Sequence, residues 1–153
     1  MKILAVFLVL ISCSIEAQEV DYSSIMKDSI HNAEAITPLD TLTLDDNSFR
    51  AERYYMQDSI KLQFRISAGT EEATKGLFEN QIVPFIKKRE KDGATVEFVE
   101  EDGIEGYLWT DRGTGGCMMY AKGKNHYFIE ISSTRDDLDF FKAFYEDVDF
   151  SSL

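Results

Sequence analysis

A strict alternation of apolar and polar residues between positions 60 and 68 constrains this chain more than any other feature of its sequence. The apolar positions are Ile60, Leu62, Phe64, Ile66 and Ala68, and the polar ones are Lys61, Gln63, Arg65 and Ser67. Successive side chains of a strand point to opposite faces, so this period of two predicts a strand with one buried and one solvated face. Since only one face needs cover, we expect this strand to lie towards an edge of its sheet.

Further segments have the composition of strands and are bounded by turn-forming residues. They span residues 42–44, 49–55, 95–99, 104–110, 117–121 and 126–131. Turn-forming residues around Gly103 and Gly123 join the last four segments into two hairpins. The apolar residues of these hairpins occupy both faces, so the hairpins are expected at the centre of the sheet.

Two helices are expected before the hairpins. Apolar residues recur at helical spacing from Tyr22 to Ala33 and predict a short N-terminal helix. Thr70 is expected to cap a second, long helix, which ends in a cluster of basic residues near Lys91. Because Pro84 has no N–H to donate, this helix should kink or break near Asn80.

A last helix is expected after the hairpins, capped by Ser133 or Thr134. Its apolar residues are Leu138, Phe141, Phe144, Tyr145 and Val148. The predicted fold class is α+β, with a mainly antiparallel sheet of about six or seven strands, two long helices covering it and a short N-terminal helix.

The N-terminus has the layout of a secretory signal peptide. Met1 and Lys2 precede an apolar run at residues 3–12, and a polar segment follows as far as Ala17. The run is about half of the roughly 20 residues that a membrane-spanning helix needs, so no transmembrane span is expected. Cleavage after Ala17 makes residues 1–17 the signal peptide and residues 18–153 a single α+β domain. The domain is then exported to the periplasm, the cell surface or the medium.

A second interpretation of the N-terminus remains open. Residues 10–13, Leu-Ile-Ser-Cys, resemble the bacterial lipobox, in which the cysteine is lipidated and becomes the new N-terminus. The signal would then be residues 1–12, and Cys13 would attach the domain to a membrane.

The charge of the chain excludes some classes of partner. There are 16 Lys and Arg against 28 Asp and Glu, a formal net charge of -12. Removal of residues 1–17 takes away one basic residue, Lys2, and one acidic residue, Glu16, so the net charge of the domain is unchanged. Nucleic acids and anionic lipid surfaces bind to clustered positive charge, so neither is expected as a partner.

Cleavage also leaves Cys117 as the only cysteine of the domain. One thiol cannot form an internal disulfide, a C-x-x-C redox pair or a thiolate zinc cage. The two histidines, His31 and His126, are isolated in the sequence and do not predict a metal site. No metal and no other cofactor is expected.

The order of strands, long helix, hairpins and last helix resembles the Mog1/PsbP-like fold, including its exported bacterial DcrB-type members. The local likeness is greatest where residues 125–133 run into residues 137–144, a strand and helix typical of such domains. The resemblance implies a small accessory or binding module, because proteins of this fold share no common active site. It transfers no catalytic residue.

Cys117 is the one candidate nucleophile, with His126 as its base. If the hairpin closes around residues 122–125, Cys117 lies beside Glu130 and His126 beside Ala121. The two side chains would then be about four strand residues, on the order of 13 Å, apart, and a catalytic dyad needs hydrogen-bond reach. A thiol packed at the start of a strand is the simpler interpretation.

Three residues are weak candidates for ligand binding. Tyr107 and Trp109 lie on one strand face and can either form a stacking platform for a sugar or peptide or pack beneath a helix. The glycine-rich segment 111–116 runs into a strand, so it favours a plain connection over a phosphate loop. If it binds a ligand, Arg112 and the glycine amides would hold a small anion. The many carboxylates near residues 97–105 and 136–149 are assigned to a solvated acidic surface.

These observations favour a non-enzymatic, exported, acidic binding or accessory module of the bacterial cell envelope, whose partner is another protein or a small ligand. A specific version is an immunity-type protein whose acidic face neutralises a basic protein. The alternatives are a small hydrolase or thiol enzyme that uses Cys117 and a structural lipoprotein anchored through Cys13.

Mass spectrometry of the mature protein distinguishes the two signals. We expect a chain that begins at Gln18, because the segment before Ala17 follows the pattern of a cleaved signal peptide. A chain that begins at an acylated Cys13 would contradict this prediction and support the lipoprotein.

Overall fold

The computed structural model describes residues 20–43, 48–101, 103–111, 116–122 and 126–153, with the backbone alone for 101, 111 and 116–122. The strands are β1 (Ser29–Ile30), β2 (Ala33–Ala35), β3 (Asp40–Thr43), β4 (Phe49–Gln57), β5 (Ile60–Ala68), β6 (Thr95–Glu101), β7 (Ile104–Asp111), β8 (Gly116–Lys122) and β9 (Tyr127–Ser133). The helices are α1 (Tyr22–Ile25), α2 (Glu71–Leu77), a π-helical turn η1 (Phe78–Ile82), α3 (Val83–Lys91) and α4 (Leu138–Glu146).

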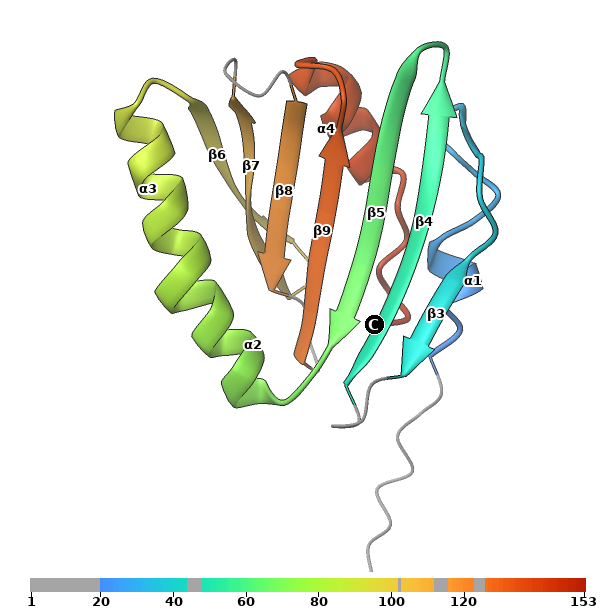
Figure 1. The fold of residues 1–153 in the computed structure, drawn as a ribbon, viewed down its shortest axis with the longest axis horizontal. Coiled ribbons are helices and arrows are strands. Elements are labelled where there is room, and N and C mark those ends of the chain that lie inside the picture. Colours follow the sequence, from blue (N-terminus) through green and yellow to red (C-terminus); the bar gives the residue numbers. More distant parts are fainter. Residues whose placement is uncertain (1–19, 44–47, 102, 112–115, 123–125) are drawn as a thin grey trace, which may run out of the picture.

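The described strands form one nine-stranded sheet, in the order β1-β2-β4-β5-β9-β8-β7-β6, with β3 paired to β4 (Figure 1). Every described pairing is antiparallel. The predicted class, an α+β fold with a mainly antiparallel sheet, is confirmed. The sheet is wider than predicted because residues 29–35 add a short hairpin at one edge.

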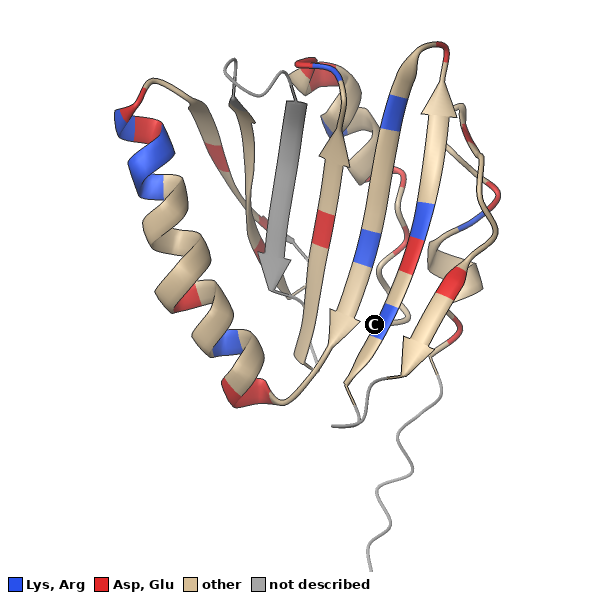
Figure 2. Cartoon of the chain, viewed as in Figure 1, with Lys and Arg blue, Asp and Glu red and all other residues tan. Residues whose placement is uncertain are grey.

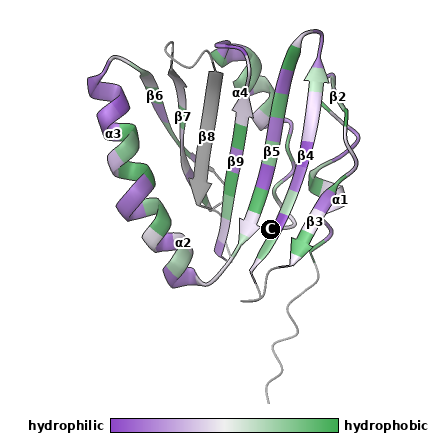
Figure 3. Cartoon of the chain, viewed as in Figure 1, coloured by the Kyte–Doolittle hydropathy of each residue, from purple (hydrophilic) through white to green (hydrophobic). Residues whose placement is uncertain are grey.

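Strand β5 alternates as its sequence predicts, and the alternation is visible in the hydropathy colours of Figure 3. Its predicted place was wrong, however, because β5 pairs with β4 on one side and β9 on the other and lies inside the sheet. Edge position is not the reason for its polar face. That face has polar side chains because no described helix packs over β4, β5 and β9 there, as Figure 1 shows.

The main core lies on the other face of β4, β5 and β9, beneath α4 and the segment that precedes β2. Its fully buried members are Ile25, Met26, Ala33, Ala51, Tyr55, Leu62, Phe64, Ile66, Ile129, Ile131, Phe141 and Phe144. The rings of Tyr55 and Phe144 meet edge to face with centroids 5.4 Å apart. This contact fixes α4 across β4 and β5.

A long helical stretch, α2 to α3, covers the opposite face at the β6 and β7 end of the sheet. Phe78 stacks on Tyr107 with ring centroids 6.0 Å apart, and Phe85 meets Trp109 edge to face at 5.3 Å. Thr70 caps the helix as predicted, since its side chain accepts a hydrogen bond from Ala73 N. Tyr107 and Trp109 therefore contact this helix from the face opposite to α4.

The predicted break near Asn80 takes the form of the π-helical turn η1. The N–H of Val83 donates to the carbonyl of Phe78, five residues earlier, where an α-helix would bond four residues earlier. Pro84 follows at once, and a proline has no N–H with which to continue the α-helical ladder. The wider turn absorbs the proline, and the helix continues to Lys91.

The predicted N-terminal helix was wrong beyond its first turn. It ends at Ile25, and the chain then forms the β1–β2 hairpin, whose two turn residues, His31 and Asn32, both have positive φ. Two residues in this conformation form the turn that best matches the twist of a hairpin. Arg53 holds the chain on both sides of this hairpin, donating to the carbonyl of Met26 and the carboxylate of Asp28 before it and to the carbonyl of Thr37 after it.

The second long helix was also wrong in length and in its cap. Helix α4 has nine residues, and its N-cap is Asp137, whose carboxylate accepts a hydrogen bond from Phe140 N at 3.1 Å. Ser133, one of the two predicted caps, is the last residue of β9 instead. The sheet is therefore covered by one long helical stretch on one face and one short helix on the other.

Substitution of Phe144 by alanine tests the packing of α4 on the sheet. Phe144 is fully buried, so Phe144→Ala should lower the free energy of unfolding by roughly 3–5 kcal/mol through lost burial and a cavity. Urea titration followed by circular dichroism measures this. Phe98 is 55% exposed, so Phe98→Ala should cost less than about 1 kcal/mol. Equal losses would contradict the described core.

Candidate functional site

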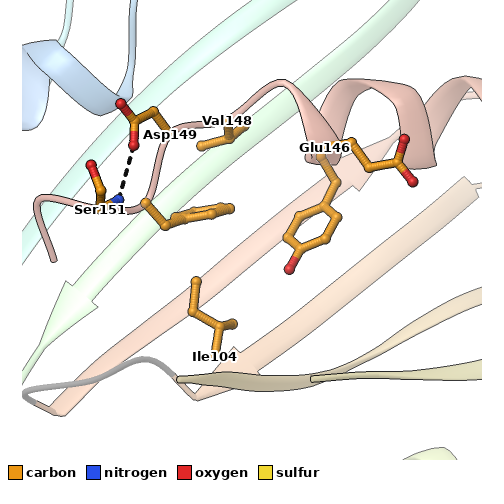
Figure 4. Close-up of a pocket in the computed structure, with 7 residues that line it drawn as sticks. Ile104, Glu146, Val148, Asp149 and Ser151 are labelled. Atoms are coloured by element: carbon orange, nitrogen blue, oxygen red, sulfur yellow. Dashed lines mark hydrogen bonds between the residues drawn. The ribbon is translucent and has the colours of Figure 1, made fainter. Parts of the chain in front are cut away.

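The short length of α4 leaves a hollow beside it, over β6 and β7. The hollow has a volume of about 400 Å³ and is lined by Glu97, Val99, Glu100, Leu108, Lys142, Tyr145 and Glu146. A smaller hollow of about 150 Å³ adjoins it, lined by Ile104, Tyr145, Glu146, Val148, Asp149, Phe150 and Ser151 (Figure 4). Because both share Tyr145 and Glu146, we treat them as one acidic groove.

Two secondary-structure elements place the side chains of the acidic groove. On β6, alternation directs Glu97 and Val99 to the face that α4 shares, and register pairs Glu97 with Leu108 of β7. On α4, the buried residues Phe141, Phe144 and Tyr145 anchor the helix to the sheet. Lys142 and Glu146 are four residues apart and so lie on the same side of the helix, facing the groove.

Carboxylates outnumber basic groups in the acidic groove. The linings include the carboxylates of Glu97, Glu100, Glu146 and Asp149 and the ammonium of Lys142. Lys142 Nζ lies 2.5 Å from Glu97 Oε2, so one carboxylate is paired. This hydrogen bond, with the attraction of Glu97, Asp139 and Glu146, raises the pKa of Lys142 above its ordinary value. Figure 2 shows acidic positions on both β6 and α4.

The floor of the acidic groove is apolar. Leu108 is 1% exposed and Ile104 is 4% exposed, and Tyr145 lies between the two hollows with 7% exposure. Carboxylates around an apolar floor suit a ligand that is itself amphipathic and cationic. The methylene stem of a lysine or arginine can lie on the floor while its charged head reaches a carboxylate.

The structure places the two aromatic candidates beneath the long helix. Trp109 is 1% exposed, and Phe85 and the guanidinium of Arg89 lie against its ring. Tyr107 is half-buried between Phe78 and Phe98. The stacking-platform interpretation is therefore wrong for Trp109, whose ring is part of the packing between helix and sheet.

The predicted register of the last hairpin was wrong by three residues. Tyr120, not Cys117, pairs with Glu130, and Ala121 pairs with Ile129. The residue after Cys117 pairs with Ser132, which is six residues along β9 from His126, a separation of roughly 20 Å. The backbone thus separates Cys117 from His126 even further than predicted, and the two do not form a dyad.

The structure describes only some of the remaining residues that the sequence suggested as functional. Arg112, Cys13 and the signal segment lie outside the described residues. His31 is in the β1–β2 turn, and its Nδ1 lies 2.8 Å from Asp147 Oδ2, at the end of α4. Within the described ranges, no three His, Cys, Asp or Glu side chains are grouped so as to hold a metal ion.

Sequence reasoning named the carboxylates of the acidic groove but not their convergence. Glu97 and Glu146 are nearly 50 residues apart, and only the antiparallel sheet and the crossing of α4 bring them together. Lys142 was missed because a single lysine among carboxylates has no sequence signature. The one available signal was the four-residue spacing of Lys142 and Glu146 on a predicted helix.

Comparison with known proteins gives no relative: no protein family, no curated protein and no solved structure matches this chain. Among the described helices, none has the length and apolar character needed to cross a membrane.

Alkylation of Cys117 tests the thiol-enzyme alternative. Since His126 is too far away to act as its base, the thiol should react with N-ethylmaleimide at pH 7 no faster than an unactivated cysteine, and His126→Ala should leave the rate unchanged. Mass spectrometry of the peptide that contains Cys117 measures the rate. Rapid labelling that is lost in His126→Ala would contradict the described hairpin and restore the dyad.

Proposed function

We propose that this protein is an exported, non-enzymatic binding module of the bacterial cell envelope, whose acidic groove binds a basic segment of a partner protein. One observation carries the proposal: carboxylates from β6 and from the α4 region surround an apolar floor. Such a site has the charge and the shape to bind cationic side chains.

The electrostatics of the chain support a cationic partner. A net charge of -12 steers a basic protein towards the domain, and the acidic groove gives the encounter a specific end point. Carboxylates at the exposed rim contribute less to affinity than to association rate, because solvent and salt screen them. Burial of aliphatic stems on the groove floor would supply the remaining affinity.

The location in the envelope rests on the sequence. Residues 1–17 have the signal-peptide pattern, and a partner would then be met outside the cytoplasm. The likeness to the Mog1/PsbP-like fold, with its small accessory modules, belongs to the same proposal. A protein lipidated at Cys13 would present the groove from a membrane surface. An immunity-type role would follow if the basic partner is a toxic protein.

Charge removal in the acidic groove tests the proposed function. The probe is a fluorescein-labelled octa-arginine peptide, titrated at low salt with binding followed by fluorescence anisotropy. The variant Glu100→Gln with Glu146→Gln removes two exposed carboxylates and should weaken binding by about tenfold, and binding by the unmodified protein should fall as salt rises from roughly 50 to 500 mM.

A matched variant separates the groove from the overall charge. Glu72 on α2 and Glu90 on α3 are exposed and lie outside both groove linings, so Glu72→Gln with Glu90→Gln changes the net charge by the same amount. This control should bind nearly as well as the original protein. Equal weakening of both variants, or binding that does not respond to salt, would contradict a specific site.

A further inference from the structure

Strand β6 forms one end of the sheet and borders the acidic groove. Among the described strands it pairs with β7 alone, so along its other edge alternate residues direct N–H and C=O groups away from the sheet. In the described part of the chain, no backbone hydrogen bond satisfies those outward groups. With seven residues, β6 is long enough to pair with one more strand.

The two faces of β6 differ in chemistry. On the face shared with α4, Glu97 and Val99 line the acidic groove. On the face shared with the long helix, register places Val96 beside Trp109 and Phe98 beside Tyr107. Phe98 is 55% exposed, the most exposed of the large hydrophobic residues described, although its ring contacts Tyr107 edge to face. The face shared with the long helix is thus apolar at Val96 and Phe98. Glu100 follows them on this face by alternation and also borders the acidic groove at the end of the strand.

We propose that a partner's extended segment pairs with the free edge of β6 as an additional strand, and that this segment alternates basic and apolar residues. Its basic side chains point to the acidic groove, while its apolar side chains point to the other face and cover Phe98. The inference rests on the proposed function, which supplies the basic character, and adds backbone pairing and the order of the residues.

The physical basis is the pleat of a strand. Side chains of an added strand alternate between the same two faces as those of β6, so alternate positions meet the groove and Phe98 in turn. Backbone hydrogen bonds supply affinity independent of sequence, and the two faces select the alternating pattern. A segment with the same residues in another order would not place its basic side chains at the groove and its apolar side chains at Phe98.

The opposite end of the sheet fits such a partner less well. Strand β3 also has an edge with no partner among the described strands, but it has four residues, all exposed, and none of them lines the acidic groove. Its one large apolar residue, Leu42, pairs in register with Arg50 rather than with a carboxylate. Strand β3 therefore serves as the control edge.

Three kinds of synthetic peptide test the proposal with the intact protein. The first alternates arginine and valine over seven residues, the second has the same composition in blocks, and the third is the alternating peptide with alternate backbone amides methylated, prepared in both registers. The alternating peptide should bind at least about tenfold more tightly than the block peptide. At least one methylated register should lose a similar factor, because methylation removes donors and blocks the approach of the edge.

Hydrogen exchange measured by mass spectrometry locates the bound strand. The alternating peptide should slow exchange in the segment that contains residues 95–101 and leave residues 40–43 unchanged. Slowing at residues 40–43 alone, or at neither segment under saturating peptide, would overturn pairing at β6.

A pair of variants tests the apolar face. Phe98→Ser should weaken the alternating peptide more than it weakens octa-arginine, because valine is buried on the Phe98 ring whereas an arginine placed there keeps its guanidinium in solvent. Leu42→Ser makes the same kind of change at β3, where Leu42 is 43% exposed, and should affect neither peptide. An equal effect of both substitutions would overturn the assignment of the edge.

The outcomes separate this inference from the proposed function. If alternating and block peptides bind equally and both depend on Glu100 and Glu146, strand addition is overturned and the groove function stands. If no peptide binds and octa-arginine also fails to bind, both proposals fail. If the alternating peptide protects β6 but ignores the glutamate substitutions, the acidic groove is overturned and edge pairing stands.

Discussion

The pairing of β5 with β9 is the interaction on which the rest of the structure depends. Seven register pairs, from Leu62 with Ser133 to Ala68 with Tyr127, join two segments that are separated by the long helix and by strands β6, β7 and β8. Closing so long a connection costs chain entropy, and only a large buried surface offsets it. The pairing provides that surface by placing Phe64 and Ile66 beside Ile131 and Ile129 on the face that α4 covers.

The same pairing makes the sheet wider than its helices can cover. Helix α4 reaches only part of one face and leaves the acidic groove at the β6 end, while the long helix leaves β4, β5 and β9 open on the other. The open face is stabilised differently, through Arg65, which lies 2.7 Å from Glu52 and 3.1 Å from Glu130 across three strands. Burial acts to raise the pKa of Glu52, but hydrogen bonds from Arg65 and Tyr54 outweigh it and lower the pKa. In this network one guanidinium pairs with both carboxylates, whereas in the groove linings only Glu97 of four carboxylates pairs with the single lysine.

The sequence predicted local features of the helices and strands, but it did not predict where these elements lie relative to one another. The alternation in β5, the cap at Thr70 and the disturbance by Pro84 depend on neighbouring residues, and all three were predicted correctly. The N-terminal helix failed because residues 26–37 are held by Arg53, a partner far along the chain that periodicity does not reveal. The edge position of β5 failed for a related reason: one-sided burial was attributed to sheet order, although an incomplete helix layer produces the same pattern. The groove likewise depends on long-range placement, because residues of β6, β7 and α4 line it together.

The acidic residues of β6 offer a physical reason why Phe98, an apolar residue, can be exposed on a strand at the end of the sheet. An uncovered edge with an exposed aromatic ring invites pairing with another copy of itself, and natural proteins prevent this with charged residues. Two β6 strands placed edge to edge would bring acidic residues of both copies near one another, and their repulsion opposes self-pairing. A basic strand meets attraction at the same positions. Under the proposed strand addition, the same charge that opposes self-pairing would favour a basic partner strand over a second copy of β6.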